Sequence, residues 1–171
     1  LEYQKVTDTA IFVRFKAIPS GPTTQHPNAP TYVPSDDEYI IIWTTTPWTI
    51  PFNLAVMANP TVTYCKVKVV YKGEPQRWWV AKDLLESFII QGLHEEYVIE
   101  EERTGAELAG RAYEHPLAEE NAVYAELKAM QPNIHTIILS SDYVDTSVGT
   151  GFVHCAPGCG PEDYEVGHRN G

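Results

Sequence analysis

Proline and glycine interrupt this chain so often that only short secondary-structure elements fit between them. The densest interruption is 18–37, where five prolines fall within twenty residues. Proline cannot donate a hydrogen bond to a sheet, so we expect this stretch to be a surface loop. Most runs between the interruptions have the composition of β-strands. The strand-like runs are residues 9–15, 38–43, 64–71, 76–81, 97–101, 133–140 and 151–154.

Three segments give the clearest structural signals. Residues 38–43 form a continuous apolar run, which is typical of a strand buried on both faces. Residues 64–71 and 76–81 flank the turn-forming sequence Lys-Gly-Glu-Pro, and this arrangement predicts an antiparallel hairpin. Residues 82–91 carry apolar side chains at helical spacing, and Gly92 is the expected C-terminal cap of that helix. These features together predict an α+β fold that is mostly β, with a barrel-like mixed sheet core and a few short helices.

The length and composition suit one domain with a real hydrophobic core. The chain has 171 residues, of which 43% are hydrophobic and 20% charged, so disorder is not expected. The net charge is −11, and such an acidic domain is a poor general binder of nucleic acid. Any contact with RNA must therefore be local or supplied by another part of a parent protein. The acid is concentrated between Glu95 and Glu126, where ten glutamates predict a solvated face.

The cysteines and the ends of the chain bear on its cellular context. Three cysteines are too few, and odd in number, for a disulfide framework, which favours a reducing compartment such as the cytoplasm. No apolar run approaches the length of a membrane span, so we expect no membrane partner. The start lacks both Met and a signal-peptide pattern, and the end stops abruptly. We therefore expect residues 1–171 to be a single domain excised from a longer chain.

The segment 145–164 gathers glycine turns, a histidine and a carboxylate. Gly149, Gly151, Gly158 and Gly160 allow the backbone to approach a neighbour closely. A glycine- and proline-rich loop can bring His154, at a strand end, and Asp163, at a helix start, to one rim. There the carboxylate could accept hydrogen bonds from an ammonium group and the imidazole could orient a water molecule. The alternative interpretation is a core histidine and a residue that favours its helix N-terminus.

The segment 43–53 offers a second group of polar side chains. Thr44, Thr45, Thr46 and Thr49 place hydroxyls close to two tryptophans, and Pro47 pushes the triplet out of helical conformation. Hydroxyls both donate and accept, so they suit a water molecule or a developing oxyanion. Threonines are also common on exposed strand faces, and this simpler interpretation stays open.

The remaining motifs give weaker signals. Cys155 and Cys159 beside His154 form an incomplete zinc ligand set, and a thiol–histidine pair is the alternative. We expect neither a zinc site nor a reactive thiol–histidine pair, and we predict no metal ligands. The chain has no phosphate-binding glycine loop. Trp78 and Trp79 are expected to pack in the core rather than to stack on bases, since basic residues are not interleaved with them.

Three segments resemble one protein family. Residues 43–56 (WTTTPWTIPFNLAV) and 149–164 (GTGFVHCAPGCGPEDY) are similar to the two signature segments of the inserted editing domain of isoleucyl-tRNA synthetase. Residues 105–117 (GAELAGRAYEHPL) resemble the segment that connects them. The resemblance covers nearly the whole chain. Valyl and leucyl relatives carry Thr-Thr-Arg-Pro where this chain has a third threonine, which favours the isoleucyl branch.

The resemblance implies roles for particular residues. Asp163 would hold the α-ammonium group of a misattached amino acid, and His154 would limit the size of the pocket. Thr44, Thr45 and Thr46 would hold the terminal adenosine, the ester carbonyl and the attacking water. The implied catalytic residues are Thr44, Thr45, Thr46, His154 and Asp163. The implied substrate-binding residues are Trp48, Thr49, Asn53, Gly151, Val153 and Asp163.

The resemblance also implies an activity and its partners. The domain would proofread for isoleucine–tRNA ligase by hydrolysing the ester of mischarged Val-tRNA(Ile), and valyl-adenylate is a further candidate substrate. Its partners would be the 3′ aminoacylated end of the tRNA, the valine moiety and the remainder of the synthetase. It would use no cofactor, since ATP and Mg belong to the absent synthetic domain. Two alternatives remain, a non-catalytic insertion that docks the tRNA acceptor end and a zinc- or thiol-dependent hydrolase.

Overall fold

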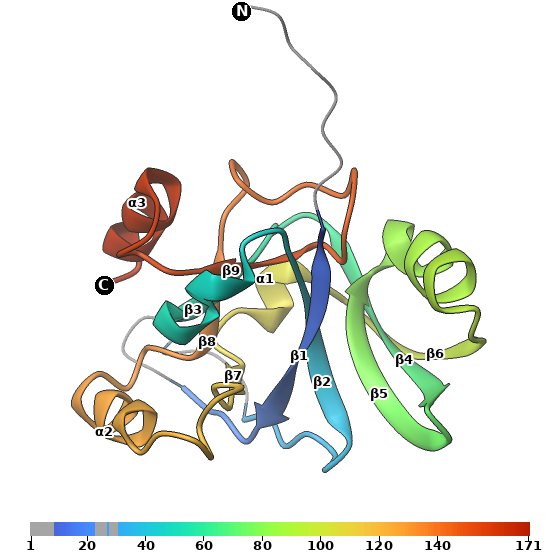
Figure 1. Ribbon diagram of the computed structural model, residues 1–171, viewed down its shortest axis with the longest axis horizontal. Helices are drawn as coiled ribbons and strands as arrows, with labels where there is room; N and C mark the ends of the chain where they lie inside the picture. The colour runs from blue at the N-terminus through green and yellow to red at the C-terminus, as the bar shows by residue number, and fades with distance from the viewer. Residues whose placement is uncertain (1–8, 23–26, 28–30) are drawn as a thin grey trace, which may run out of the picture.

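The computed structural model describes residues 9–22, 27 and 31–171, and strands make up most of its regular structure (Figure 1). Part of the proline-rich stretch 18–37 lies outside the described residues; in the described part, a single bridge joins Ser20 to Tyr32. The strands are β1 (Ile11–Ile18), β2 (Glu38–Thr44), β3 (Ala55–Ala58), β4 (Thr63–Tyr71), β5 (Glu74–Ala81), β6 (Tyr97–Thr104), β7 (Ala112–Tyr113), β8 (Thr136–Leu139) and β9 (Phe152–Cys155).

The helices are short and lie around the sheet. They are η1 (Pro47–Phe52), η2 (Lys82–Leu84), η3 (Glu86–Leu93), α1 (Gly105–Leu108), α2 (Val123–Met130) and α3 (Pro161–Arg169). Among the described residues, no helix is both long and apolar enough to cross a membrane.

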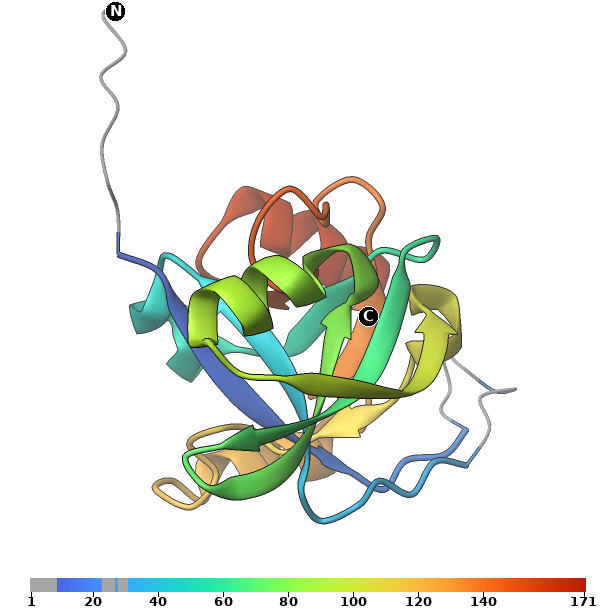
Figure 2. The ribbon, with the colours of Figure 1, turned by 90° about the vertical axis from the view of Figure 1, so that its right-hand side faces the viewer.

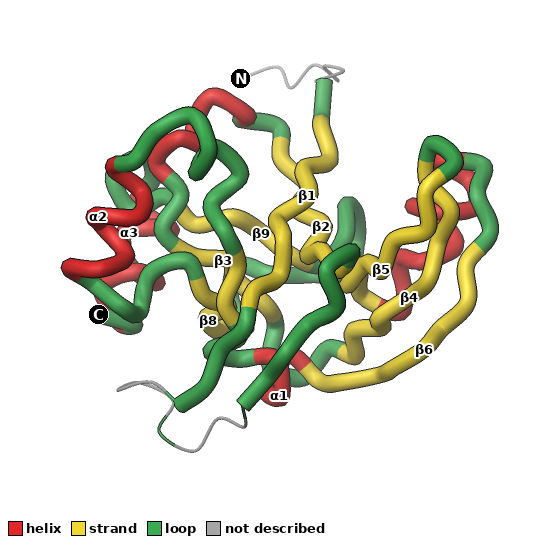
Figure 3. The backbone as a smooth tube through the Cα atoms, turned by 90° about the horizontal axis from the view of Figure 1, so that it is seen from below, coloured by secondary structure: helices red, strands yellow, loops and turns green. Residues whose placement is uncertain are grey.

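The strands form one mixed sheet in the order β6-β4-β5-β2-β1-β7-β8-β3-β9. Two of its pairings, β2 with β5 and β3 with β8, are parallel, and the others are antiparallel. The sheet curls so strongly that β9, at its end, packs against β2 near its middle. The curl is visible from below in Figure 3, where the strands wrap around a common interior. This architecture confirms the prediction of a mostly β fold with a barrel-like mixed sheet.

The apolar run in β2 lies at the centre of the core. Ile40, Ile41 and Ile42 are at most 2% exposed, so the strand is buried on both faces as its sequence predicts. They belong to one large cluster that also includes Phe15, Tyr64 and many further side chains from most of the strands. The core therefore supports the ends of β2 and β9, where the polar segments of the sequence begin.

The predicted hairpin is present as β4 and β5. Its strands pair from Tyr64 opposite Ala81 to Tyr71 opposite Glu74, which leaves only Lys72 and Gly73 in the turn. Both turn residues have positive φ angles, 53° and 86°. This conformation is the type I′ turn that matches the twist of antiparallel strands. The second strand consequently starts two residues earlier than the sequence suggested.

The helix expected at 82–91 exists but ends differently. It consists of η2 and then η3, whose wide π-type turns carry the backbone past Gly92. The chain leaves the helix at His94, which has a left-handed φ of 58° and whose N–H donates to the carbonyl of Ile89. The prediction of Gly92 as the cap is therefore wrong. The hydrogen bonds of this helix span five residues rather than four, which shifts its end.

The acidic stretch 95–126 is more ordered than a simple solvated face. In β6, Glu100, Glu101 and Glu102 form ion pairs with Arg77, Lys66 and Lys82, which project from the neighbouring part of the chain. The later glutamates lie mostly on the surface around α2, a helix that the sequence analysis did not predict. The ion pairs of β6 thus neutralise several of the few cations in the chain.

Two glycines at the entrance to β9 are required by their surroundings. Gly149 has φ of 85°, and a Cβ atom built there would lie 2.9 Å from the ring of Trp43. Gly151 has φ of 77°, and its Cβ would lie 2.4 Å from the Cβ of Ala81. Gly158, by contrast, has neither a positive φ nor a heavy atom within 4 Å of the added Cβ. Close approach therefore explains the first two glycines and does not explain Gly158.

We predict that Gly151→Ala destabilises the fold by about 2–4 kcal/mol, because it combines left-handed strain with a steric clash. Urea unfolding followed by tryptophan fluorescence measures this change. Gly158→Ala is the matched control, and it should change the free energy of unfolding by less than about 0.5 kcal/mol. Equal stability of the two variants would contradict the explanation.

Candidate functional site

Strand β3 brings the two polar segments of the sequence together. It pairs antiparallel with β9, so that Val56 lies opposite His154 and Ala55 opposite Cys155. The N–H of Leu54, just before β3, donates to the carbonyl of Cys155 at 2.9 Å. Helix η1 directly precedes β3 and the glycine-rich loop directly follows β9. Both are consequently held at the same rim of the sheet.

A cavity of about 380 Å³ opens between these segments. It contains eight of the side chains that the sequence analysis assigned to the site. Its lining residues are Trp43, Thr44, Thr45, Thr46, Trp48, Thr49, Val153, His154, Cys159, Gly160, Glu162 and Asp163. Trp43, Cys159, Gly160 and Glu162 were not among the predicted site residues, although all four lie within the family-like segments 43–56 and 149–164.

The threonine hydroxyls form a connected chain along one wall. The Oγ1 atoms of Thr44 and Thr46 are 3.3 Å apart, and those of Thr46 and Thr49 are 3.4 Å apart. The N–H of Thr46 also donates to Oγ1 of Thr44, which fixes the turn that follows β2. Thr45 and Thr46 are exposed toward solvent, whereas Thr44 is buried. The wall thus presents hydroxyls that are anchored from behind.

The hydrogen bonds of Thr49 determine the tautomer of His154. The Thr49 hydroxyl donates its only proton to the carbonyl of Thr46 at 2.8 Å. Its oxygen lies 3.0 Å from Nε2 of His154, so it must accept a proton from that nitrogen. Nδ1 is then the unprotonated nitrogen, and it is buried without a hydrogen-bond partner among the described residues. His154 is therefore fixed in orientation as part of the cavity wall.

Burial keeps His154 neutral. Its side chain is 5% exposed, and desolvation lowers its pKa below the usual value, although the charge of Asp163 acts in the opposite direction. A neutral imidazole with Nε2 already bonded to Thr49 is poorly placed to remove a proton from a water molecule. The geometry favours a role in shaping the cavity.

Asp163 lies in the first turn of α3 and faces the same cavity. Its Oδ2 accepts a hydrogen bond from the N–H of Ala156 at 2.9 Å, which closes the glycine-rich loop against the helix. No hydrogen bond from the described residues reaches Oδ1. One half of the carboxylate thus holds the loop, and the other half remains able to bind a positively charged group.

Two residues that the resemblance implied as substrate-binding, Asn53 and Gly151, do not line this cavity. Asn53 is 1% exposed, and its side chain bonds to the carbonyl of Ala55 and to the hydroxyl of Tyr113. Gly151 is also buried, and its carbonyl accepts a hydrogen bond from Tyr64 at 2.7 Å. The polar groups of both residues form hydrogen bonds within the protein. We therefore do not carry them into the site.

A buried clamp, formed by His115 and Tyr124, holds η1 from behind. The Nδ1 atom of His115 accepts the N–H of Leu117, so Nε2 carries the proton and donates to the carbonyl of Ile50 at 3.1 Å. The ring of Tyr124 stacks on His115, and its hydroxyl donates to the carbonyl of Pro51. The sequence analysis missed this clamp. His115 lies within the family-like segment 105–117, but nothing there indicated its partner.

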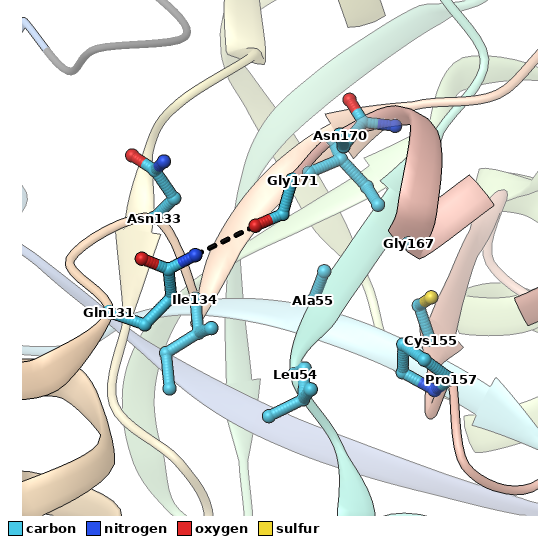
Figure 4. A pocket seen from close by; sticks show the side chains of 11 residues that line it. Leu54, Ala55, Gln131, Asn133, Ile134, Cys155, Pro157, Gly167, Asn170 and Gly171 are labelled. Carbon is cyan, nitrogen blue, oxygen red and sulfur yellow. Dashed lines mark hydrogen bonds between the residues drawn. The ribbon is translucent and has the colours of Figure 1, made fainter. Parts of the chain in front are cut away.

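A second hollow of about 200 Å³ lies around Leu54, Ala55 and the end of α3, and Figure 4 shows its lining residues. Its titratable group is Cys155, and burial raises the pKa of that thiol to about 12. A thiol that stays protonated at neutral pH is a poor nucleophile. Among the described residues, no three His, Cys, Asp or Glu side chains are arranged to hold a metal ion. The 380 Å³ cavity is therefore the better candidate for chemistry.

Comparisons with known proteins show which proteins the chain is similar to. No protein-family model matches the chain. The isoleucine–tRNA ligase of Pyrococcus abyssi is 40% identical over 171 residues, covering 99% of this chain and 14% of that protein. The isoleucine–tRNA ligase of Methanoculleus marisnigri is 37% identical over 171 residues, covering 100% of this chain and 14% of that protein. The chain thus spans about one seventh of the length of these curated relatives.

Solved structures identify the fold. The cytosolic leucyl-tRNA synthetase editing domain of P. knowlesi matches with a TM-score of 0.58 and 13% identity, covering 96% of this chain and 64% of that one. The corresponding domain of P. falciparum matches with a TM-score of 0.53 and 15% identity, covering 74% of this chain and 44% of that one. At such low identity these likenesses establish the fold alone.

We predict that the stability of the domain falls in mild acid, chiefly through His135, which lies beside the clamp. Desolvation, with His115 and Lys128 nearby, lowers the pKa of His135 from 6.5 to about 4. Between these two pH values the unfolded chain binds a proton that the folded chain does not. The free energy of unfolding should therefore drop by about 2–3 kcal/mol between about pH 7.5 and about pH 4.5 on account of this residue.

Urea titrations at the two pH values measure this dependence. His135 has a φ of 53°, and asparagine tolerates that left-handed conformation. His135→Asn is accordingly the suitable variant, and it should lose much of the pH dependence. An unchanged pH dependence in this variant would show that other groups carry the effect.

Proposed function

We propose that this chain, which belongs to the editing domains of class I aminoacyl-tRNA synthetases, hydrolyses the ester that joins misattached valine to the isoleucine tRNA. The observation that carries the proposal is the 380 Å³ cavity, where the threonine wall faces Asp163 across a neutral histidine. The relatives are isoleucine–tRNA ligases, and the fold is that of a synthetase editing domain.

The need for such an activity follows from the weakness of hydrophobic discrimination. One methylene group changes binding by only about 1–3 kcal/mol, and isoleucine against valine is the standard example of this limit. A second site that hydrolyses only the smaller product restores accuracy. Valyl-adenylate carries the same amino acid and is a further candidate substrate of the same cavity.

Asp163 is suited to recognise the α-ammonium group that every aminoacyl ester carries. Its Oδ2 is committed to the N–H of Ala156, which fixes the carboxylate in place. Its other oxygen can then form a charge-assisted hydrogen bond with the ammonium group, and such bonds are stronger than neutral ones. This contact would place the ester carbon near the middle of the cavity.

The threonine wall is suited to position the ester and the attacking water. Thr45 and Thr46 present exposed hydroxyls, and Thr44 anchors the turn from behind. Trp48, which is 70% exposed, and Val153 provide apolar contact for the adenosine and the amino acid side chain. An ester is reactive enough to be cleaved by an oriented water molecule, so positioning can replace a strong base. No covalent intermediate and no cofactor of this domain is required.

The setting of this activity is a further part of the proposal. The chain would act as one domain of a cytoplasmic isoleucine–tRNA ligase, whose remaining parts activate the amino acid and bind most of the tRNA. The 3′ aminoacylated end of the tRNA would move into the cavity described above. The acidic surface of the domain is compatible with this role because only that end needs to be bound.

We predict that Asp163→Asn in the parent enzyme lowers the rate of Val-tRNA(Ile) deacylation by about 10-fold or more. Asparagine can still accept the N–H of Ala156, but it lacks the charge that pairs with the ammonium group. Single-turnover deacylation measures the effect. Glu162→Gln, an exposed neighbour at the same cavity, is the matched control and should retain most of the activity. Wild-type deacylation by the Asp163 variant would refute the proposed role of Asp163. An intact parent enzyme that binds the tRNA with full affinity but does not deacylate Val-tRNA(Ile) would favour a domain that only docks the tRNA.

His154→Ala should broaden the substrate range, because it removes a buried wall of the cavity. We expect correctly charged Ile-tRNA(Ile), which the wild-type domain spares, to be deacylated at a rate within about 10-fold of that for Val-tRNA(Ile). Thr49→Val, which removes the hydrogen bond to His154 but keeps the ring, should broaden it less. If both variants still spare Ile-tRNA(Ile), another residue sets the size limit.

A further inference from the structure

The cationic side chains of this acidic chain differ in whether they have a carboxylate partner. In the described part of the chain, one group forms ion pairs with carboxylates, namely Lys66, Arg77, Lys82, Arg103, Arg111 and Arg169. Lys128 instead donates to backbone carbonyls. Arg14, Lys16, Lys68 and Lys72 have exposed side chains, and no ion pair involving them is found among the described residues. Arg14 and Lys72 lie at one and the same surface hollow.

This hollow has a volume of about 210 Å³ and is rich in aromatic side chains. We call it the β1 trough and define it by Phe12, Arg14, Tyr71 and Lys72. Phe12 is 46% exposed. The guanidinium of Arg14 lies 5.6 Å from the ring centre of Tyr71, and the ammonium of Lys72 lies 5.3 Å from the same ring. The trough therefore combines aromatic faces with two cations that lack carboxylate partners.

The β1 trough is continuous with the candidate site. In the pairing of β1 with β2, Phe12 lies opposite Trp43 and Arg14 opposite Ile41. Residues directly opposite in an antiparallel pair project to the same face, with Cα atoms only about 4.5–5.5 Å apart. Trp43 lines the 380 Å³ cavity and Phe12 lines the trough, so the register of these two strands places the trough next to the cavity. Figure 1 shows η3 and the β4–β5 hairpin on one side of β1 and η1 on the other, and Figure 2 views the molecule from the side of η3 and the hairpin.

We propose that the β1 trough binds the single-stranded nucleotides that immediately precede the terminal adenosine of the tRNA. The inference rests on the proposed function, since it takes the adjoining cavity to hold the terminal adenosine of the tRNA. Phe12 stacks on the base nearest the cavity, and Arg14 and Lys72 contact successive phosphates that precede it. Aromatic faces combined with cations are the usual means by which proteins hold single-stranded nucleic acid.

The charges around the trough limit the path that an RNA strand can take. On its other side Arg14 also lines a second hollow, together with Lys16, and there Glu114, Glu119 and Glu120 repel phosphate. At the other end, Glu74 lies opposite Tyr71 and closes the favourable region. The strand therefore runs from Lys72 past Arg14 to Phe12 and the cavity. In a chain with a net charge of −11, this short path is where an RNA backbone is favoured.

The test measures the binding of a single-stranded RNA that ends in CCA to the full chain, by fluorescence anisotropy over a series of salt concentrations. The double variant Arg14→Ala, Lys72→Ala should bind about 10- to 100-fold more weakly at low salt. Its slope of log affinity against log salt should fall by about 1.4, or 0.7 for each lost phosphate contact. Lys68→Ala is the matched control, since Lys68 is an equally exposed cation outside the trough and lies opposite Arg77 in the hairpin. Its affinity should change less than about twofold.

A second variant tests the stacking contact. Phe12 also packs on Phe88, with ring centres 4.4 Å apart, so Phe12→Leu is chosen to keep apolar contact while removing the aromatic face. It should weaken RNA binding about 5- to 100-fold with little change in salt slope. Wild-type affinity and slope in both variants would overturn the inference.

The failure of this inference can be told apart from failure of the proposed function. Asp163→Asn should keep the RNA affinity of the wild type while losing deacylation in the parent enzyme. If that variant loses deacylation and the trough variants bind RNA normally, the proposed function stands and the trough inference fails. If the wild-type chain binds the RNA no better than the double variant and the parent enzyme does not deacylate Val-tRNA(Ile), both fail.

Discussion

The hydrogen bonds of β3 are the constraint on which the rest of the site depends. This strand of four residues pairs with β8 on one side and with β9 on the other. It therefore ties the threonine segment, which enters β3 through η1, to a histidine about one hundred residues later in the sequence. Val56 opposite His154 is the pair that fixes this register. A slip of one residue would turn the imidazole to the other face of the sheet and separate it from Thr49.

A second set of contacts holds η1 in place beside the paired strands. Helix η1 is short, contains Pro51 and has no side-chain cap, so its own hydrogen bonds hold it weakly. The clamp of His115 and Tyr124 supplies donors to two of its carbonyls from behind. The bond between Tyr113 and Asn53 secures the residue at its end. The wall of the cavity is consequently held by neutral, buried donors, which add no charge to the site in front of them.

The sequence allowed the elements with a local pattern to be predicted, and it failed where distant partners decide the structure. The hairpin, the buried strand β2 and the mostly β fold follow from local alternation, turn residues and apolar runs. Eight proposed site residues line one cavity. The family resemblance allowed the threonine segment and the histidine segment to be paired in the prediction, because their spacing alone left that pairing open. Asn53 could not be placed, because its role depends on Tyr113, sixty residues away. The clamp was missed because its partners are likewise distant in the sequence. The end of η3 was missed because no sequence pattern indicates π-type turns.

The burial of His154 also explains how Asp163 can serve a ligand. A protonated imidazole so close to the carboxylate would pair with it and compete with any ammonium group that entered the cavity. The charge of Asp163 acts to raise the pKa of His154, but desolvation has the larger effect and lowers it. The imidazole therefore stays neutral at neutral pH, and the bond from its Nε2 to Thr49 keeps its proton away from the carboxylate. The cavity thus combines an uncompensated carboxylate with uncharged hydroxyls, which is the polarity that the proposed aminoacyl ester substrate would require.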